Sequence, residues 1–367
     1  MKKIIFISLI ILAAFSSCKN QGWSFPDFSY TTVYFAYQYP VRTIELGDDN
    51  VFDNSLDNAH KCQIMGTFGG AYASKSDITI GIKVDNTLCD GLSFVGGGVV
   101  MPMPSNYYTL SSNQITIPKG NVMGPVGVQL TDAFFADPLA ITKTYVIPVV
   151  MTSVQNADSI LSGTPQVDNP NRCIAGNWSV LPKDYILYAV KYINPWDANY
   201  LRRGKDVITK DGNTATTIRH GEYVENDEVI KLTTLSMTGL KMPMPGYKDR
   251  LGDNLNMTIM LNFENSQKCT VAPTSAAYQL NDSIRVYNIT ATGNGQFVKL
   301  GDKNSWGNQD RNVLYLNYET SFDIEISFPN VKPQLPNDYQ SVKYATTDTL
   351  VVRDRGVAME TFDVVHN

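Results

Sequence analysis

The sequence predicts an all-β protein, and three observations support this prediction. Charged residues make up only 18% of the chain, whereas aromatic residues make up 11% and include 20 tyrosines. Such a composition is typical of strands that bury one face. Short candidate strands recur at intervals of roughly 10–20 residues, and no long stretch has helical periodicity. We therefore expect antiparallel strands that pack as sandwiches.

The first 18 residues have the features of a secretory signal. Lys2 and Lys3 precede an apolar run over residues 4–15, and Ser16 and Ser17 lead to Cys18. The run is shorter than the roughly 20 apolar residues that a transmembrane helix needs. A cysteine directly after small residues resembles a bacterial lipobox. We expect a signal peptide over 1–17 and a lipidated tether over 18–29 that anchors the chain to a membrane. An ordinary signal peptide cleaved near a cysteine is the alternative.

The strands of the first predicted domain, residues 30–154, follow the tether. Residues 76–85 alternate most clearly, because Ile78, Ile80, Ile82 and Val84 fall on one face. The other expected strands lie in 30–37, 61–70, 106–120, 124–134 and 143–154. Residues 155–172 are rich in Asn, Asp, Ser and Pro, which predicts a linker.

A second β domain is expected over residues 173–367. Its candidate strands lie in 176–193, 228–240, 255–264, 282–293, 296–301, 312–320, 322–328 and 348–354. The strands between residues 281 and 328 follow one another closely and predict a meander of hairpins. Periodicity alone leaves a sandwich, a jelly roll and a barrel-like fold open for this domain.

Residues 107–153 resemble the N-terminal domain of unknown function found in surface lipoproteins of gut-dwelling Bacteroidetes, which also precedes family 18 endoglycosidase modules. The positions that carry the resemblance are Tyr108, Leu110, Ile115, Ile117, Pro118, Gly120, Val126, Val128, Asp137, Pro138, Tyr145, Ile147 and Pro148. This family implies an immunoglobulin-like sandwich. Residues 194–204, 311–319 and 348–356 resemble the C-terminal partner domain of the same lipoproteins.

The resemblance implies a polysaccharide-utilisation system, in which outer-membrane lipoproteins bind or trim oligosaccharides and polysaccharides beside other uptake proteins. Lys19, Asn20 and Gln21 follow the cysteine, where such surface lipoproteins often carry acidic residues. Both the surface-exposed and the periplasmic face therefore stay open.

Two loops of the second domain combine aromatic rings with planar polar groups, as a sugar site requires. The first loop supplies Trp196, Tyr200, Arg202 and Arg203, and the second supplies Trp306, Asp310 and Arg311. We predict these seven residues as carbohydrate-binding. The alternative is a structural role, with the tryptophans in the core and the arginines paired to carboxylates.

Other site classes find little support in the sequence. Cys62, Cys89, Cys173 and Cys269 form no CxxC pair, and both disulfides and free thiols stay open. The acidic segment 45–58 reads as a solvated turn rather than a calcium site. We expect no metal, cofactor or catalytic residue, and a net charge of −5 argues against nucleic acid. The favoured function is a non-catalytic, glycan-binding envelope lipoprotein. The alternatives are a glycoside hydrolase with an unrecognised carboxylate pair and a structural adhesin or pilus-like protein.

Overall fold

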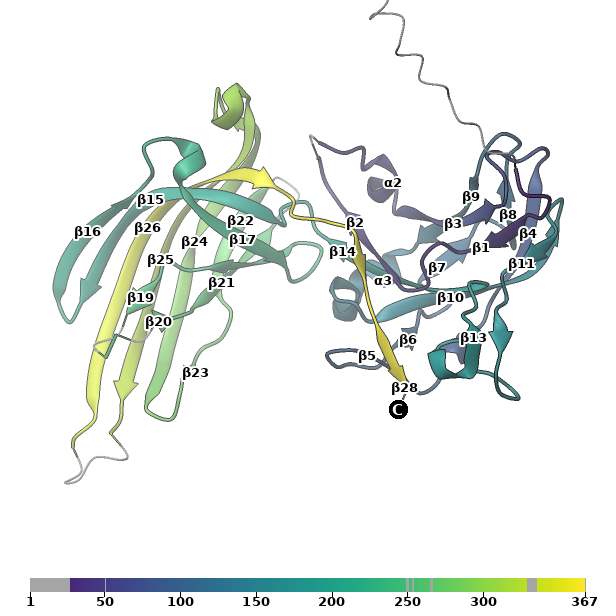
Figure 1. Cartoon of the computed structure of the whole chain (residues 1–367). Helices are drawn as coiled ribbons and strands as arrows, with labels where there is room; N and C mark the ends of the chain where they lie inside the picture. The colour runs from purple at the N-terminus through teal and green to yellow at the C-terminus, as the bar shows by residue number, and fades with distance from the viewer. Residues whose placement is uncertain are drawn as a thin grey trace, which may run out of the picture.

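The computed structural model describes residues 27–49, 51–248, 251–252, 254–264, 267–328 and 335–366. It consists of two β bodies that lie side by side (Figure 1), which confirms the predicted all-β class. The signal peptide and Cys18 lie outside the described residues, so the lipid anchor stays a prediction. No helix in the described part of the chain has the length and apolar character needed to cross a bilayer.

The N-terminal domain is a sandwich of two sheets. One sheet has the order β11 (Ser159–Ile160), β1 (Thr32–Tyr34), β3 (Lys61–Gly69), β9 (Met123–Leu130) and β7 (Tyr108–Leu110). The other has the order β27 (Glu360–Thr361), β2 (Pro40–Glu45), β14 (Tyr185–Ile193), β10 (Tyr145–Gln155), β4 (Ile78–Val84) and β8 (Gln114–Ile117), with β6 (Met101–Pro102) beside β10.

Smaller elements cover the ends of this sandwich. Two small two-stranded sheets pair β12 (Thr164–Pro165) with β13 (Trp178–Val180) and β5 (Leu92–Phe94) with β28 (Val364–His366). The short helices are α2 (Ser55–Asn58), α3 (Asp132–Ala136), η1 (Asn86–Cys89), η2 (Pro138–Ile141) and η3 (Ala175–Asn177).

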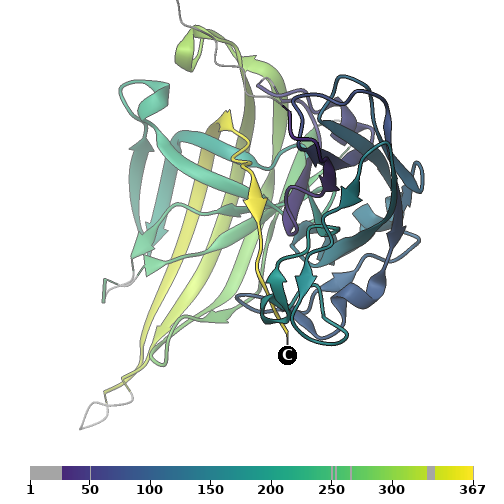
Figure 2. The ribbon, with the colours of Figure 1, turned by 45° about the vertical axis from the view of Figure 1, so that its right-hand side comes forward.

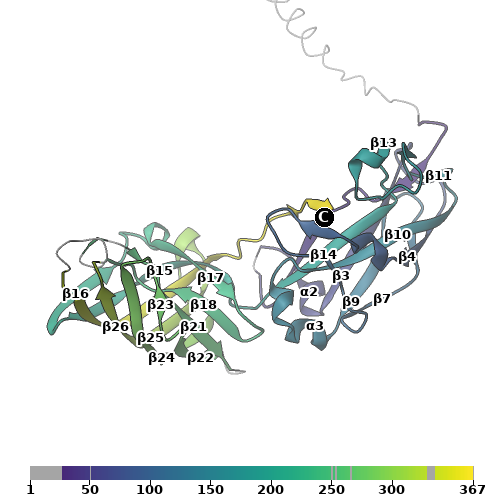
Figure 3. The ribbon, with the colours of Figure 1, turned by 90° about the horizontal axis from the view of Figure 1, so that it is seen from below.

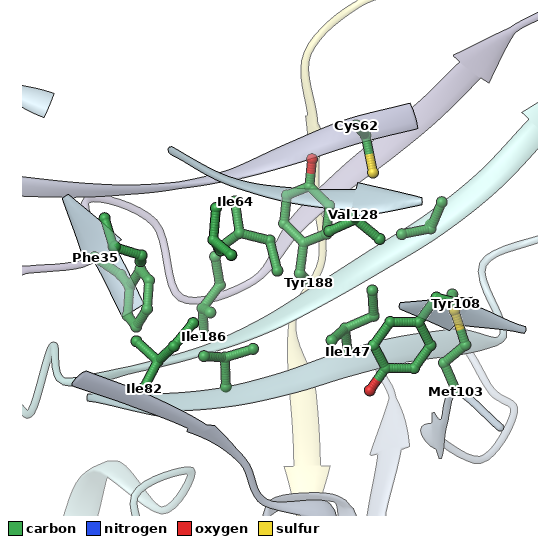
Figure 4. Close-up of a cluster of buried hydrophobic side chains, with 14 of the residues drawn as sticks. Phe35, Cys62, Ile64, Ile82, Met103, Tyr108, Val128, Ile147, Ile186 and Tyr188 are labelled. Carbon is green, nitrogen blue, oxygen red and sulfur yellow. The ribbon is translucent and has the colours of Figure 1, made fainter. Parts of the chain in front are cut away.

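The core of the N-terminal domain lies between its two sheets. Ile64 and Val128 from one sheet meet Ile147 and Ile186 from the other (Figure 4), and all four side chains are buried. Alternation along the strands produces this arrangement, since every second residue of β9 is buried. Burial of each such side chain contributes about 1.5–3 kcal/mol. Cys62, Cys89, Cys173 and Cys269 are free thiols.

The predicted boundary at 155–172 is corrected by the structure, because the first domain continues to Ile193. Strand β14 runs antiparallel to β10 and parallel to β2, in the middle of the second sheet. Its sequence, YILYAVKYI, is apolar on both faces, as expected of a strand covered on both sides. The polar segment 155–172 supplies the edge strands β11 and β12 of the same domain.

The C-terminal domain is an antiparallel barrel. Its strands follow the order β15 (Ala198–Lys210), β17 (Glu228–Thr234), β18 (Gly239–Pro243), β21 (Thr258–Phe263), β22 (Lys268–Pro273), β24 (Ile284–Asp302), β25 (Arg311–Ile326) and β26 (Asp338–Asp354). Strand β26 also pairs with β15, for example at Leu201 and Val351, so the sheet closes on itself. Figure 2 shows its strong curvature. Of the predicted alternatives, the barrel-like fold is the one found.

Additional elements border this barrel. Strand β16 (Asn213–Arg219) pairs with the second half of β15, and β23 (Tyr278–Gln279) pairs with β24. A small pair, β19 (Tyr247–Lys248) and β20 (Asn254–Leu255), lies beside them. Two short helical turns complete the domain, η4 (Val224–Asn226) and η5 (Trp306–Asn308).

The last residues of the chain return to the N-terminal domain (Figures 1 and 3). There β27 pairs with β2, and β28 pairs with β5. The buried ring of Phe362 packs against Tyr39 and Phe94, with ring centroids 5.5 and 5.1 Å away. The predicted domain over 173–367 is therefore corrected at both ends, since only its middle part forms the barrel.

Candidate functional site

Two of the predicted sugar-binding rings, Trp196 and Tyr200, belong to the barrel core. Trp196 is only 6% exposed, and its indole stacks on Phe263 at 3.9 Å between ring centroids. Tyr200 is fully buried and donates its hydroxyl hydrogen bond to the Trp196 carbonyl oxygen at 2.7 Å. The predicted loop is mainly the start of β15, which directs alternate residues into the barrel. The assignment of these two rings to a sugar site is therefore corrected.

Arg202 lies in the same barrel interior and serves a buried ion network. Its Nη2 donates to the Asp348 Oδ2 at 3.0 Å, and both side chains are fully buried. Arg219 donates from Nη2 to the other Asp348 oxygen at 2.6 Å and also pairs with Asp206. The Tyr318 hydroxyl completes the shell of Asp348 at 3.0 Å. The guanidinium nitrogens of Arg202 all donate hydrogen bonds within the protein, so Arg202 has a structural role. Its predicted contact with sugar is therefore corrected.

Arg203 and Asp310 hold loops in place. The Arg203 Nε lies 2.6 Å from Oδ2 of the buried Asp227, which also accepts a hydrogen bond from the Gly221 amide. The Asp310 carboxylate pairs with Lys303 at 2.7 Å and accepts the Asn304 amide at 3.0 Å. The hydrogen bond from Lys303 holds the pKa of Asp310 below its usual value. Neither side chain lines a cavity described below.

Of the seven predicted residues, Arg311 lines a cavity wall, and Trp306 lies directly behind it. The Arg311 guanidinium lies 3.5 Å from the centre of the Trp306 ring, within cation–π distance. The Trp306 indole donates to the Val352 carbonyl oxygen at 3.2 Å, which fixes the ring on the outside of the barrel. Arg311 and Val352 both line a cavity between the two domains.

This interdomain cleft consists of two cavities, of about 220 and about 370 Å³, whose walls share Asp48 and Asn312. The smaller cavity is also lined by Glu45, Asp49, Val51, Phe52, Arg311, Val352, Arg353, Asp354, Arg355, Gly356 and Val357. The larger one is also lined by Gly47, Asn58, Pro195, Gln267, Phe297 and Lys299. Both domains therefore contribute to each cavity.

Local hydrogen bonds fix the N-terminal wall of the cleft. The Asp49 Oδ1 accepts the amides of Val51 and Phe52 at 2.6 and 3.0 Å, which forms an Asx turn. The buried Asp57 accepts the Glu45 amide at 2.9 Å and pairs with Arg42. These contacts agree with a turn after Asp49, whereas the buried Asp57 and helix α2 correct the expectation of a solvated turn over the whole segment 45–58. They leave the ring of Phe52 69% exposed beside the cleft.

Arg355 joins both domains behind the cleft. Its Nη1 donates to the Leu46 carbonyl oxygen at 3.1 Å, and its Nη2 donates to that of Asn194 at 2.9 Å. Among the residues that the structure describes, its buried Nε finds no hydrogen-bond partner. Burial raises the pKa of the neighbouring Glu45, and the positive charge of Arg355 partly offsets this effect. A second bridge joins the domains at the rim, where Lys299 lies 2.8 Å from Asp48.

Sequence reasoning missed most of this wall. Glu45, Asp48 and Phe52 lie in a segment interpreted only as a turn, and Arg353, Asp354 and Arg355 were not among the predicted site residues. The one pairing found within that trio is between Arg353 and Asp354, at 3.5 Å. The abundance of Asp and Asn in 45–58 is the only sequence signal at this wall, and it does not indicate which distant segment faces it.

Comparisons with known proteins identify the family. Residues 195–356 match the domain of unknown function DUF5627, and residues 28–158 match a family model described as an N-terminal domain. A crystal structure of a Bacteroides ovatus protein of unknown function is 44% identical, with a TM-score of 0.80, and the match covers 93% of this chain and 100% of that one. No curated protein matches the chain.

More distant structures share only a loose resemblance. A second Bacteroides ovatus protein of unknown function is 10% identical over 89% of this chain and 94% of that one, with a TM-score of 0.42. An auxiliary nutrient binding protein from Bacteroides thetaiotaomicron is 11% identical over 84% and 90%, with a TM-score of 0.33. Likenesses this weak carry no functional argument. The full-length match at 44% identity does decide the family, and the chain belongs to a two-domain family of Bacteroides proteins in which an N-terminal domain precedes DUF5627.

Proposed function

We propose that this protein binds glycans in the interdomain cleft without catalysing their breakdown. The observation that carries the proposal is the mixture of groups on its walls. Phe52 and the planar Arg311 guanidinium, which stacks on Trp306, offer flat surfaces, while Asp48 and Asn312 offer hydrogen-bonding oxygens and an amide. A sugar ring has apolar C–H faces and a hydroxyl rim, and so it complements such a surface.

The cellular setting of the proposal comes from the sequence. A lipid on Cys18 and the tether that follows would hold both domains at the bacterial outer membrane, where oligosaccharides and polysaccharides meet uptake proteins. Cells that express a Cys18→Ala variant should incorporate no labelled palmitate into the protein, whereas the wild type should. Equal labelling of the two proteins would reject the anchor.

The cleft can be tested with a pair of matched variants in the full mature chain. Phe52 and Tyr72 are both aromatic residues of the N-terminal domain and are both 69% exposed, but only Phe52 lines the cleft. On a glycan array or an affinity gel, Phe52→Ala should weaken retention about tenfold, which corresponds to about 1.4 kcal/mol. Tyr72→Ala should match the wild type. Equal retention by wild type and Phe52→Ala for every bound glycan would remove the cleft from the proposal.

A second candidate function, glycoside hydrolysis, is favoured by one observation. Glu45 and Asp49 line the same cavity, and burial raises the pKa of Glu45, as a general acid requires. A pair of carboxyl groups is the usual machinery of glycosidases. Incubation with N-glycan and plant polysaccharide pools would release reducing ends if the protein hydrolyses them, and Glu45→Gln would abolish that release. No release by the wild type would reject this candidate and leave the binding role.

A further inference from the structure

A second surface with sugar-binding chemistry lies on the outer wall of the barrel. Strands β22, β24, β25 and β26 lie side by side there (Figure 1) and form a groove of about 510 Å³. Two adjacent cross-strand rows cross this groove. One row contains Lys268, Gln296, Tyr315 and Thr349, and the other contains Thr270, Asn294, Asn317 and Thr347.

The direction of these side chains follows from the strand pattern. Along β25 the residues on either side of Tyr315, Leu314 and Leu316, are buried inside the barrel, whereas Tyr315 and Asn317 are exposed. The same alternation in β26 buries Asp348 between Thr347 and Thr349. Both rows therefore face solvent. Because neighbouring strands lie about 4.8 Å apart, each row of four residues spans about 14 Å, enough for a short oligosaccharide.

The hydrogen-bonding groups in these rows are not used by the protein itself. Within the described residues, none of the eight side chains forms a hydrogen bond or an ion pair with another part of the chain. Some cross-strand neighbours elsewhere on the same outer surface are paired. Lys343 lies 2.9 Å from Glu319, and the Thr290 hydroxyl lies 2.7 Å from that of Ser321. The amide and hydroxyl groups of the groove are therefore available to hydrogen-bond a ligand.

The charge of the groove restricts its ligand. Its charged side chains with exposed ends are Lys268 and Glu264, of opposite sign, while the remaining polar groups of the two rows are neutral. Tyr315, 41% exposed, places an aromatic ring among them. A phosphate or an acidic sugar would find no excess of positive charge here. We propose that this groove binds a neutral oligosaccharide, with the Tyr315 ring against a sugar face and Asn294, Gln296 and Asn317 at its hydroxyl groups.

This second site is independent of the interdomain cleft, and the experiment separates the two. The full mature chain and its variants are titrated by calorimetry with cello-, xylo-, manno- and malto-hexaose, with oligogalacturonate as an acidic probe. Tyr315→Ala and Asn317→Ala should each weaken binding of at least one neutral hexaose about tenfold. Phe52→Ala should affect only binding in the cleft and leave the component of binding that depends on Tyr315 and Asn317 unchanged. Tyr339→Ala, which removes a ring that is 57% exposed but outside the groove, serves as the control.

The variants lie on the barrel surface, so their melting temperatures should match that of the wild type and exclude unfolding as a cause. The inference is overturned if Tyr315→Ala and Asn317→Ala bind every neutral hexaose as the wild type does. It is also overturned if only oligogalacturonate responds to them. A wild type that binds a neutral hexaose but responds only to Phe52→Ala would reject the groove and retain the cleft.

Discussion

The ion network inside the barrel allows a quantitative test of how the C-terminal domain is held together. Asp348 is fully buried and accepts hydrogen bonds from Arg202, Arg219 and Tyr318 at 2.6–3.2 Å. Asp348→Asn keeps the shape of the side chain but removes its negative charge. The guanidinium of Arg202, also fully buried, then has no carboxylate partner, because Asp206 pairs with Arg219. Breaking a buried pair in this way costs about 3–5 kcal/mol.

Urea unfolding, followed by tryptophan fluorescence and far-ultraviolet circular dichroism, measures this loss. The barrel contains Trp196 and Trp306, so its unfolding should change the fluorescence. Glu319→Gln is the matched control, because Glu319 pairs with Lys343 on the same barrel while both side chains are more than half exposed. An exposed pair of this kind contributes about 0–1 kcal/mol. If Asp348→Asn loses less than about 1 kcal/mol at an unchanged urea slope, the argument from burial is refuted.

Three further predictions concern the domain interface and the returning C-terminal segment. Phe362→Ala should destabilise the N-terminal domain by about 3–5 kcal/mol, visible as faster amide exchange in β5, since the ring fills a space between Tyr39 and Phe94; unchanged exchange would contradict this. Gly47→Ala should loosen the interface and speed proteolysis near Pro195, because Gly47 has φ +89° and an added Cβ would lie 2.6 Å from the Pro195 Cβ; wild-type proteolysis would contradict the contact. Because the pKa of Glu45 is raised in the folded protein, the protonated carboxyl group stabilises the fold. This stabilisation is complete below pH 4.5 and is lost as the pH rises through the higher pKa of the folded state. Glu45→Gln should therefore flatten the pH dependence of the unfolding free energy above pH 4.5, and an unaltered profile would count against burial of this carboxyl.

Local sequence patterns predicted the fold class because strand alternation is a local property. The residues of β9 alternate between core and solvent, and those of β4 do so up to Ile82, whereas Val84, predicted on the buried face, is exposed. The domain to which a strand belongs, in contrast, depends on residues far away in the sequence. Strand β14 follows a polar segment that looks like a linker, and its position between β10 and β2 depends on pairing partners about 40 and 150 residues away. The same limit applies to Phe362, whose partners lie in the opposite half of the chain.

The candidate site was only partly predictable for a related reason. Trp306 and Arg311 lie within six residues of one another, and the structure stacks them with Arg311 at the cleft; their contact with sugar stays a prediction. Trp196 and Tyr200 also lie close to arginines in the sequence, but Trp196 directly precedes β15 and Tyr200 lies in it, and both rings are buried in the barrel core. Residue type therefore does not separate a binding ring from a core ring. Whether a ring is buried or exposed depends on which face of the strand points into the barrel. This orientation is set by the pairing of β15 with β26.

The way the chain passes between the domains explains how a cleft made of distant segments can be preformed. The chain crosses once after Ile193 and again after Asp354, so two strands of backbone link the bodies instead of one flexible linker. Arg355 lies on the second crossing and donates to Asn194 on the first and to Leu46 at the cleft wall, which ties both crossings to the N-terminal domain. A single linker with a small interface would favour relative domain motion. Here two crossings, joined by the buried guanidinium of Arg355, restrict relative motion of the domains. A site whose walls are restricted in this way loses less conformational entropy when it binds a ligand.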